Sequence, residues 1–411
     1  MEVKPGYKQT EVGVIPEEWC VRPLLTTVRI ASGQVSPKVE PYKSMVLVAP
    51  DHIESSTGRL LAKQTAEEQR AISGKYVFES GDIVYSKIRP YLRKAVLASF
   101  AGLCSADMYP LKPAADVSSG FIFATVLSYR FSKYAESVSV RSGMPKINRA
   151  ELAEFTLGLP PLPEQRAIAT ALSDVDALLV ALERLIAKKR DLKQATMQQL
   201  LTGQSRLPGF YGDWQVRLLG DLINSCSSGA TPRRDQPDFY KGDIRWITSG
   251  ELNYNVITDT VEKITSEAVA QTNLKVIPKG TFLMAITGLE AAGTRGSCAI
   301  VGEPSTTNQS CMAIFPTSEL LTDYLFHYYV FRGDALALQY CQGSKQQSYT
   351  AKLVRKLPIS VPPTTEEQTA IATVLSDMDD ELAALEKRLA KTRALKQGMM
   401  QELLTGRTRL V

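Results

Sequence analysis

The chain has 411 residues, of which 44% are hydrophobic, which is enough to form the cores of two or three ordinary domains. Its 48 Lys and Arg against 43 Asp and Glu give a net charge of +5, which fits a nucleic-acid partner without demonstrating one. A polar N-terminus and the lack of about 18 consecutive apolar residues predict a cytoplasmic protein with no membrane partner. Six scattered cysteines and two histidines, without close-spaced ligand pairs, predict neither a metal site nor disulfides.

Residues 1–160 have the composition of a mixed α/β domain, called head 1 below. Strand-like runs occur at residues 43–48 and 82–85, and Ser80-Gly81 marks a turn between them. Short helices are expected near residues 120–137.

Residues 161–203 form a predicted long helix, because they consist mainly of Ala, Leu, Glu, Lys, Arg and Gln. Pro163 lies at its start and Gly203 at its end, where these residues are tolerated or favoured. Apolar residues spaced 3, 4, 3 and 4 apart form a stripe that is typical of a helix–helix seam: Leu172, Val175, Leu179, Leu182 and Ile186.

Residues 204–360 form a second mixed α/β region, head 2. Strand-like runs occur at residues 244–247 and 281–286, and a helix is expected near residues 319–338. The two heads match each other only at anchor points. Trp19 corresponds to Trp214, for example, and Gly81 to Gly280.

Residues 361–411 contain a second predicted long helix that repeats the first. Residues 164–207 and 367–410 align without a gap at an offset of 203, with 28 of 44 positions identical, so the chain arose by duplication. The second helix carries the same stripe: Leu375, Met378, Leu382, Leu385 and Leu389.

The two stripes predict that the long helices pair with each other, and a two-fold relation between the halves requires them to run antiparallel. The alternative is that each stripe packs on its own globular head. Because the second copy ends where the sequence before Trp19 would continue the first, we expect the two termini to lie close together.

Basic residues with aromatic and amide neighbours gather in loops of both heads. Arg and Lys neutralise phosphates, and Arg, Asn and Gln also read base edges, so these loops are candidate DNA contacts; solvated loops without function are the alternative. The candidates in head 1 are Lys87, Arg89, Tyr91, Arg93, Lys94, Arg141, Ser142, Lys146 and Asn148. Those in head 2 are Thr231, Arg233, Arg234, Lys241, Arg295, Asn308, Gln309, Ser344, Lys345, Gln346 and Gln347.

Sequence motifs for catalysis are missing. The chain has no phosphate-binding Gly-x4-Gly-Lys-Ser/Thr loop, no Gly-x-Gly-x-x-Gly after a strand, and no motif around His52 or His327. Pro237-Asp238 lacks the downstream acidic-x-Lys partner of a metal-dependent nuclease. We therefore predict a chain without catalytic residues and without a cofactor of its own.

Three motifs, which occupy four stretches of the chain, resemble the specificity (S) subunit of type I restriction-modification systems. They are the N-terminal residues 6–19, the Leu-Pro-Pro-Leu-Pro-Glu-Gln run from residue 159, and the Leu-Leu-Thr-Gly-x-x-Arg-Leu ends at 200–207 and 403–410. The resemblance covers the whole chain. The one departure is an additional residue in the Pro362-Pro363 lead-in before the shared Glu-Gln.

The resemblance implies an α+β fold with a pseudo-two-fold internal repeat. Target recognition domains at 1–160 and 204–360 would be joined and separated by spacer helices at 161–203 and 361–411 that form an antiparallel coiled coil. Each head would read one half of a bipartite asymmetric site in double-stranded DNA. Two methyltransferase (M) subunits would dock and methylate adenine, and restriction (R) subunits would join through them; S-adenosylmethionine, ATP and Mg would be bound by these partners.

Two other interpretations compete with a DNA-specificity subunit. A coiled-coil scaffold that binds only proteins would have the same helices but no DNA readout. A stand-alone nuclease or methyltransferase would need the catalytic motifs that the sequence lacks.

Overall fold

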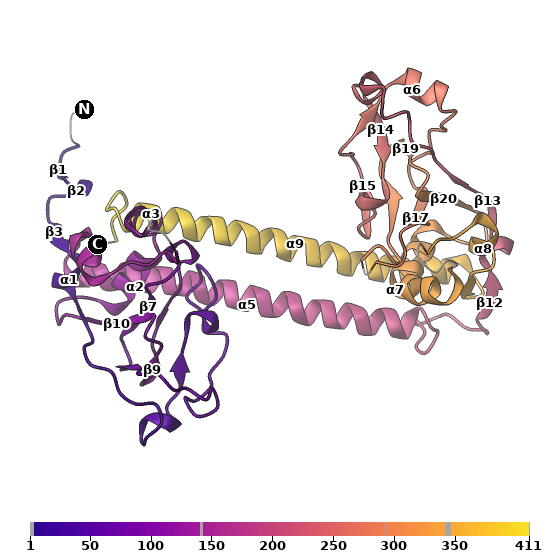
Figure 1. The fold of residues 1–411 in the computed structure, drawn as a ribbon. Coiled ribbons are helices and arrows are strands. Elements are labelled where there is room, and N and C mark those ends of the chain that lie inside the picture. The colour runs from indigo at the N-terminus through magenta and orange to yellow at the C-terminus, as the bar shows by residue number, and fades with distance from the viewer. Residues whose placement is uncertain (1–3, 140–142, 292, 342–346, 411) are drawn as a thin grey trace. The chain divides into compact units, whose positions relative to one another are not determined.

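The computed structural model describes residues 4–139, 143–291, 293–341 and 347–410 (Figure 1). The chain forms two compact units. Unit 1 comprises Met1–Arg184 and Lys387–Val411, and unit 2 comprises Leu185–Glu386. Each unit contains one head and part of both long helices. The boundaries between the two units lie inside the long helices and do not coincide with the limits of the four predicted segments. The division into heads and spacer helices therefore stays a prediction about function.

The two predicted long helices are present and equal in length. Helix α5 covers Leu162–Leu200 and helix α9 covers Thr365–Leu403, 39 residues each. Each is followed by a glycine in the left-handed region, Gly203 at φ 71° and Gly406 at φ 70°. Only glycine adopts this conformation without steric cost, which explains why both helices end at the same point of the repeat.

Ion pairs fix the direction of the helices within unit 1. Asp176 of α5 pairs with Lys396 of α9 at 2.5 Å, and Glu183 pairs with Arg393 at 2.7 Å. Rising numbers in α5 therefore meet falling numbers in α9, so this part of the pair is antiparallel.

Within unit 2, Lys189 pairs with Glu381 at 2.7 Å and Lys193 pairs with Asp379, again in antiparallel order. The Lys193–Asp379 pair is the repeat equivalent of Lys396–Asp176, since both partners are shifted by 203. The predicted antiparallel pairing is confirmed in both units.

The predicted seam residues are all at least partly shielded from solvent. Leu172, Leu182, Ile186 and Leu375 are buried. The remaining six, in both helices, are half-buried: Val175, Leu179, Met378, Leu382, Leu385 and Leu389.

Head 1 contains short strands and helices in unit 1. Its strands are β1 Tyr7–Thr10, β2 Gly13–Pro16, β3 Cys20–Pro23, β4 Val28–Ile30, β5 Leu47–Val48, β6 Tyr76–Phe78, β7 Ile83–Ser86, β8 Ala95–Leu97, β9 Gly102–Cys104, β10 Met108–Pro113 and β11 Thr156–Leu159. Its helices are α1 Leu24–Thr27, α2 Ser119–Leu127, α3 Tyr129–Val138 and α4 Arg149–Glu154, with 3₁₀ turns at Tyr42–Ser44, Pro50–His52 and Pro90–Leu92.

The main sheet of head 1 has the order β4-β10-β7-β8, and a smaller sheet has the order β5-β9-β6. Buried Phe121, Ile122 and Phe131 of α2 and α3 belong to the same core cluster as Ile83 and Tyr85 of β7. The strand predicted at residues 43–48 is shorter than expected. Its first part is a 3₁₀ turn after Pro41, since proline favours a turn, and only Leu47–Val48 pairs with β9.

Head 2 contains a comparable set in unit 2. Its strands are β12 Gln215–Leu218, β13 Ile223–Ser228, β14 Ile244–Ile247, β15 Asn255–Ile257, β16 Lys263–Ile264, β17 Phe282–Ala285, β18 Cys298–Val301, β19 Thr306–Thr307, β20 Cys311–Pro316 and β21 Pro358–Val361. Its helices are α6 Ser266–Gln271, α7 Thr322–Tyr340 and α8 Ala351–Val354, with 3₁₀ turns at Leu219–Asp221, Pro237–Tyr240 and Ser249–Glu251.

The main sheet of head 2 has the order β13-β20-β17-β18-β15, and a second sheet has the order β16-β14-β19. Helix α7 packs on β17 and β18, as α2 packs on β7 and β8 in head 1. Sheets and helices occur together in both heads, so the predicted α+β class is confirmed.

Each long helix begins with a buried Glu-Gln pair that binds its head. In unit 1, the Gln165 Oε1 accepts a hydrogen bond from the Ser118 N–H at 2.8 Å, and its Nε2 donates to the Asp116 carbonyl at 3.3 Å. In unit 2, Gln368 makes the same two contacts with Leu321 and Glu319, at 2.9 and 2.8 Å. These partners also differ by 203, so the junction between head and helix is part of the repeat.

The described N-terminal and C-terminal segments meet within unit 1. The Tyr7 hydroxyl donates to the Gly406 carbonyl at 3.0 Å, and Arg409 pairs with Glu18 at 2.7 Å. Figure 1 shows β1–β3 beside the C-terminal end of α9. The predicted closeness of the termini agrees with these contacts.

Candidate nucleic-acid interface

In head 1, the structure brings together two basic segments that lie apart in the sequence. The basic loop, residues 87–94, connects β7 to β8, and residues 143–149 lead into α4. The Arg89 N–H donates to the Pro145 carbonyl at 2.8 Å, and the Ile147 N–H donates to the Lys87 carbonyl at 2.9 Å. The predicted cations of these two segments therefore belong to one surface.

Three of these candidates have side chains available to a ligand. Arg89, Lys146 and Tyr91 are exposed, Tyr91 to 53%, and none of them forms a side-chain hydrogen bond or ion pair within the described residues. Lys87 is half-buried, with its Nζ 5.2 Å from the Tyr109 ring centroid. An unpaired exposed cation can contact phosphate without first breaking an internal pair.

The other candidates of this surface support the loop. The Arg93 Nε donates to the Ser132 Oγ at 3.0 Å, and the Lys94 Nζ donates to the Pro50 carbonyl at 2.7 Å. The Asn148 Oδ1 accepts from the Glu151 N–H at 2.9 Å and thereby caps α4. The hydrogen bonds of these three side chains hold the loop and the start of α4 in place, whereas Arg89 and Tyr91 are exposed.

The backbone of the basic loop is strained. Arg89 and Arg93 have φ angles of 47° and 48°, and they flank the 3₁₀ turn Pro90–Leu92. A side chain in this left-handed region costs on the order of 1 kcal/mol or more, and such strain gathers at functional sites. The loop conformation thus adds a second reason to regard this surface as functional.

Head 2 has an equivalent loop after β17. The Leu289 N–H donates to the Gln347 carbonyl at 3.2 Å, and the Tyr349 N–H donates to the Ile286 carbonyl at 2.9 Å. Gly288, with φ 72°, takes the left-handed position that Arg89 takes in head 1. The equivalent loop thus keeps the backbone path but lacks the arginine.

A second polar surface in head 2 combines residues 229–241 with residues 307–309. The Ala230 N–H donates to the Thr307 carbonyl at 3.1 Å, and the Thr231 hydroxyl donates to the Gln309 Oε1. The Asn308 Oδ1 accepts from the Ser310 N–H at 3.0 Å. Three predicted residues, Thr231, Asn308 and Gln309, therefore lie together.

Four of the predicted cations of head 2 lie within the described residues, and each is paired with a carboxylate. The pairs are Arg233–Asp235 at 2.6 Å, Arg234–Glu262 at 2.6 Å, Lys241–Asp238 at 2.7 Å and Arg295–Asp334 at 2.6 Å. Arg234 also lies 4.3 Å from the Tyr240 ring centroid, which gives it a structural role. Exposed pairs such as Arg233–Asp235 contribute only about 0–1 kcal/mol, so phosphate can compete for the cation.

Five predicted residues, Arg141, Ser142, Ser344, Lys345 and Gln346, lie outside the described residues. The neighbouring Gln347 is described. Its backbone N–H donates to the Glu290 Oε2 at 3.0 Å, and its buried side-chain Oε1 accepts no hydrogen bond from the part of the chain that the structure describes.

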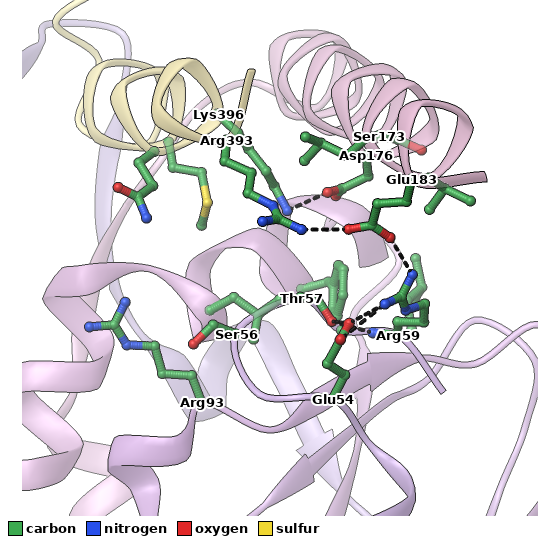
Figure 2. Close-up of a pocket in the computed structure, with 18 residues that line it drawn as sticks. Glu54, Ser56, Thr57, Arg59, Arg93, Ser173, Asp176, Glu183, Arg393 and Lys396 are labelled. Carbon is green, nitrogen blue, oxygen red and sulfur yellow. Dashed lines mark hydrogen bonds and ion pairs between the residues drawn. The ribbon is translucent and has the colours of Figure 1, made fainter. Parts of the chain in front are cut away.

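A cavity of about 490 Å³ lies in unit 1 between residues 54–59, α2 and the two long helices (Figure 2). Arg59 bridges its walls, with contacts to Glu54 at 2.9 Å and to Glu183 of α5 at 2.6 Å. Because Glu183 also binds Arg393 of α9, one ion network connects head 1 to both helices. Sequence patterns give no signal for Arg59, which is 124 residues from Glu183.

The buried carboxylates at the helix starts were also not among the predicted site residues. Arg409 binds Glu164 at 2.6 Å and Arg206 binds Glu367 at 2.5 Å, with both carboxylates 1% exposed. A signal was present, since these polar residues are identical in both copies of the repeat. A buried charge at a fixed repeat position indicates a structural pair.

The described residues contain no group of three or more His, Cys, Asp or Glu side chains that could hold a metal ion. No helix in the described ranges is long and apolar enough to cross a membrane. Their buried thiols have raised pKa values because burial disfavours the thiolate, as for Cys104, whose pKa rises to about 12.

Comparison with known proteins places these features in a family context. Residues 51–194 and 211–393 match the family of the type I restriction modification DNA specificity domain. Over 228 residues the chain is 35% identical to the specificity subunit of the type I restriction enzyme EcoDI of Escherichia coli. This match covers 54% of the chain and spans about half the length of the relative, 49%.

Two further similarities cover nearly the whole chain. The putative MjaX specificity subunit of Methanocaldococcus jannaschii is 23% identical over 98% of the chain and 97% of its own length. The type I restriction-modification S subunit of M. genitalium has a solved structure with a TM-score of 0.60 at 13% identity, and the match covers 98% of both chains. The structural likeness shows that the chain has this fold.

Proposed function

The chain belongs to the family of type I restriction-modification DNA specificity subunits, and from this premise we propose that each head reads one half of a bipartite, asymmetric site in double-stranded DNA. The observation that carries the proposal is the strained basic loop of head 1, in which Arg89 and Tyr91 are exposed and have no side-chain partner within the described residues. Arginine contacts phosphate and guanine edges, which provides both affinity and selectivity.

Two different half-sites are supported by the difference between the heads. Head 1 presents Arg89 where head 2 has Gly288, and head 2 presents Thr231 and Gln309 beside carboxylate-paired arginines. Unlike side chains on similar backbones form different hydrogen bonds with base edges. An asymmetric DNA site follows from such unlike heads.

We further propose that the long helices set the spacing between the half-sites. Helices of 39 residues are about 58 Å long at 1.5 Å per residue. Their matched ends, each with a buried Glu-Gln start and a glycine stop, define one fixed length per copy. The distance between two reading elements determines the half-site spacing in other bipartite readers.

Partner subunits supply the chemistry in this proposal. Two methyltransferase subunits would dock on the repeated scaffold and use S-adenosylmethionine to methylate adenine, and restriction subunits would join through them with ATP and Mg. The chain itself is then a non-catalytic subunit of the complex. The duplicated scaffold supports two docking positions, because the two copies are identical at 28 of 44 positions and offer similar helix surfaces.

The proposal is tested by DNA binding of the purified chain with and without methyltransferase subunits. We expect sequence-selective binding whose affinity falls steeply with salt, because phosphate contacts release counterions. Adenine methylation profiling of the host genome should then give a split motif that disappears when the gene is deleted. No DNA binding with the partners present would instead support a scaffold that binds only proteins.

A matched insertion tests the spacer role. Seven residues inserted in α5 after Lys188 and seven in α9 after Glu386 keep the stripe in phase and lengthen both helices by about 10 Å. The recognised spacer should grow by about three base pairs at 3.4 Å each, with both half-sites unchanged. Changed half-sites with an unchanged spacer would contradict the division between heads and helices.

A head exchange tests the assignment of the half-sites. Replacing residues 204–360 by head 2 of another family member should change one half-site and leave the other. The control is the equivalent exchange of residues 1–160, which should change only the other half-site. If either exchange altered both half-sites, independent reading by the heads would be wrong.

A further inference from the structure

Unit 1 contains an open groove between head 1 and the end of α9. It has a volume of about 640 Å³ and lies between α2, α3, β11 and the C-terminal end of α9. Phe155 and Leu157 line it from the head, and Met400 and Leu404 line it from α9. The volume is within the range of pockets that bind ligands, about 300–1,000 Å³.

The duplication identifies the position in unit 2 that corresponds to this groove. Helices α2 and α7 begin at Ser119 and Thr322, and their offset of 203 equals that of the Gln165 and Gln368 contacts just before them. Thr125, which lines the groove, therefore corresponds to Tyr328. A small side chain stands in head 1 where head 2 has an aromatic ring.

Tyr328 is packed inside unit 2. It is 6% exposed, and its hydroxyl donates to the Pro358 carbonyl at 3.4 Å. Met197 and Leu201, the equivalents of Met400 and Leu404, are 3% and 1% exposed and belong to the same core cluster as Tyr328. Their equivalents in unit 1 are only half-buried.

The neighbouring position shows the same reduction in size. Ala124 corresponds to His327, which is 2% exposed and lies 3.0 Å from the Ser376 Oγ. Beside Ala124 is a cavity of about 90 Å³ that also borders Met400. Two successive residues of α2 are thus smaller than their equivalents in α7, and both border empty space.

The charges around the groove favour an acidic ligand. Arg93, Arg130 and Arg407 line it, and no carboxylate is among its lining residues within the described part of the chain. The Arg407 side chain has an exposed contact to Glu402 at 3.5 Å, which a ligand carboxylate can replace. Arg130 lies over the Phe155 ring at 5.0 Å, close to the apolar wall.

We propose that this groove binds a segment of a partner protein through an aromatic side chain next to acidic residues. The aromatic ring would take the space that Tyr328 fills in unit 2, and the carboxylates would pair with Arg130 and Arg407. Buried aromatic anchors and arginines contribute most of the binding energy in many interfaces. Since unit 2 fills the equivalent space itself, this partner contact belongs to one half of the chain only. The proposal does not depend on DNA readout.

Random twelve-residue peptides displayed on phage test the proposal with the full-length chain as bait. Thr125→Tyr serves as counter-bait, because it fills the groove as Tyr328 does in unit 2. Peptides enriched on the unaltered chain should share Tyr, Phe or Trp within three positions of Asp or Glu. A labelled peptide of this class should bind at least tenfold more weakly to Thr125→Tyr, and about threefold to tenfold more weakly to Arg130→Glu and Arg407→Glu.

Controls keep the test decisive. Thr125→Ser leaves the groove open and should bind normally, while Gln401→Trp fills it from the α9 side if Thr125→Tyr fails to fold. Tyr328→Thr opens the equivalent space in unit 2, where Gln204 stands in place of Arg407, so the added site should bind the peptide at least threefold more weakly than the groove of unit 1. Peptides without the aromatic-acidic pattern, or binding unaffected by both filling variants, would overturn the proposal. Single-stranded oligonucleotide binding that the filling variants abolish would assign the groove to nucleic acid instead.

Discussion

The two units are alike where a head meets a helix and different where a head faces solvent. Glu164 and Gln165 of unit 1 make contacts that Glu367 and Gln368 repeat in unit 2, with partners displaced by the same 203 residues. The loops after β7 and β17 share only a backbone path and a left-handed residue. The junction between head and helix, which both halves need, was therefore retained after duplication, while the surfaces available to ligands diverged.

This comparison shows that side chains alone can make similar frameworks unlike. Arg89 stands where head 2 has Gly288, Thr125 where it has Tyr328, and Ala124 where it has His327. The first difference changes what a head can bind, and the other two change how tightly it packs on the helices. At each of these positions, a residue can be replaced in one unit, and the equivalent position in the other unit serves as the control.

The largest expected effect comes from the buried carboxylates. Arg206 binds both oxygens of Glu367, at 2.5 and 2.6 Å, and the nearby Trp214 indole N–H has no hydrogen-bond partner among the described residues. Arg206→Met should therefore lower the free energy of unfolding by about 3–5 kcal/mol, measured by urea denaturation, since it leaves a buried charge unpaired. The double variant with Glu367→Gln should recover part of this loss.

Arg409→Met is the matched variant in unit 1, and we expect a smaller loss. Glu164 keeps the hydrogen bond from the Trp19 indole N–H, at 3.0 Å, after Arg409 is replaced. Trp19→Phe combined with Arg409→Met should bring the loss to that of Arg206→Met. Equal losses for the two single variants would show that the indole hydrogen bond of Trp19 does not stabilise Glu164 when Arg409 is replaced.

The next effect concerns pH and His327. Burial is the main reason that its pKa falls from 6.5 to about 4; the Asp379 carboxylate opposes this shift and Lys193 adds to it. Because the folded pKa lies below the unfolded value, the contribution of His327 is fully present above pH 6.5 and is lost as the pH falls toward 4. At pH 5 the loss should be about 2 kcal/mol.

Urea denaturation at pH 7 and pH 5 measures this effect. His327→Gln keeps a hydrogen-bonding group near Ser376 but does not titrate, so its stability should fall less between the two pH values. Ala124→Gly in unit 1 controls for a change at the equivalent position without a titrating group. An equal pH dependence for His327→Gln and the unaltered chain would exclude His327 as the cause.

The sequence predicts the helices well because their signals are local. Composition, the 3,4 spacing and the terminal Gly203 and Gly406 place α5 and α9 with good accuracy. The run at residues 43–48 shows the opposite case, since a propensity for strand does not reveal that Pro41 precedes a turn. The matching stripes of the repeat predict that the helices pair, and a two-fold relation between the halves predicts the antiparallel order.

The candidate site was predictable only in part. The basic character of residues 87–94 is visible in the sequence, but the division between exposed Arg89 and supporting Arg93 depends on Ser132, 39 residues away. The partners of the head 2 cations depend on folding in the same way, as for Arg234 and Glu262. Whether a cation is free or paired is a property of the packed loops, which periodicity does not encode.

A third prediction compares the free and paired cations in DNA binding. Arg89→Ala should weaken binding about tenfold or more and lower the salt slope by about one, because an unpaired exposed cation is lost. Arg233→Ala should have a smaller effect, since Asp235 already neutralises this arginine at 2.6 Å. Fluorescence anisotropy with duplex DNA over a range of salt concentrations measures both.

Asp235→Asn sharpens this comparison, because it frees Arg233 and should strengthen DNA binding at low salt. Lys38→Ala, at an exposed position outside both candidate surfaces, serves as a control and should change binding little. If Arg233→Ala weakened binding more than Arg89→Ala, the head 2 surface would be the stronger DNA contact.

The smallest expected effect separates the two units at the helix surface. Glu183 pairs with Arg393, as Glu386 pairs with Arg190 in unit 2, but within the described residues only Glu183 has an added partner from a head, Arg59. Because Arg59 is 42% exposed, Arg59→Ala should lower the free energy of unfolding by only about 0.5–1 kcal/mol, and high salt should remove the difference. Urea denaturation at 0.05 M and 1 M salt measures it. Arg190→Ala is the control without a head contact: an equal, equally salt-sensitive loss would mean that Arg59 adds no attachment of head 1 to the helices.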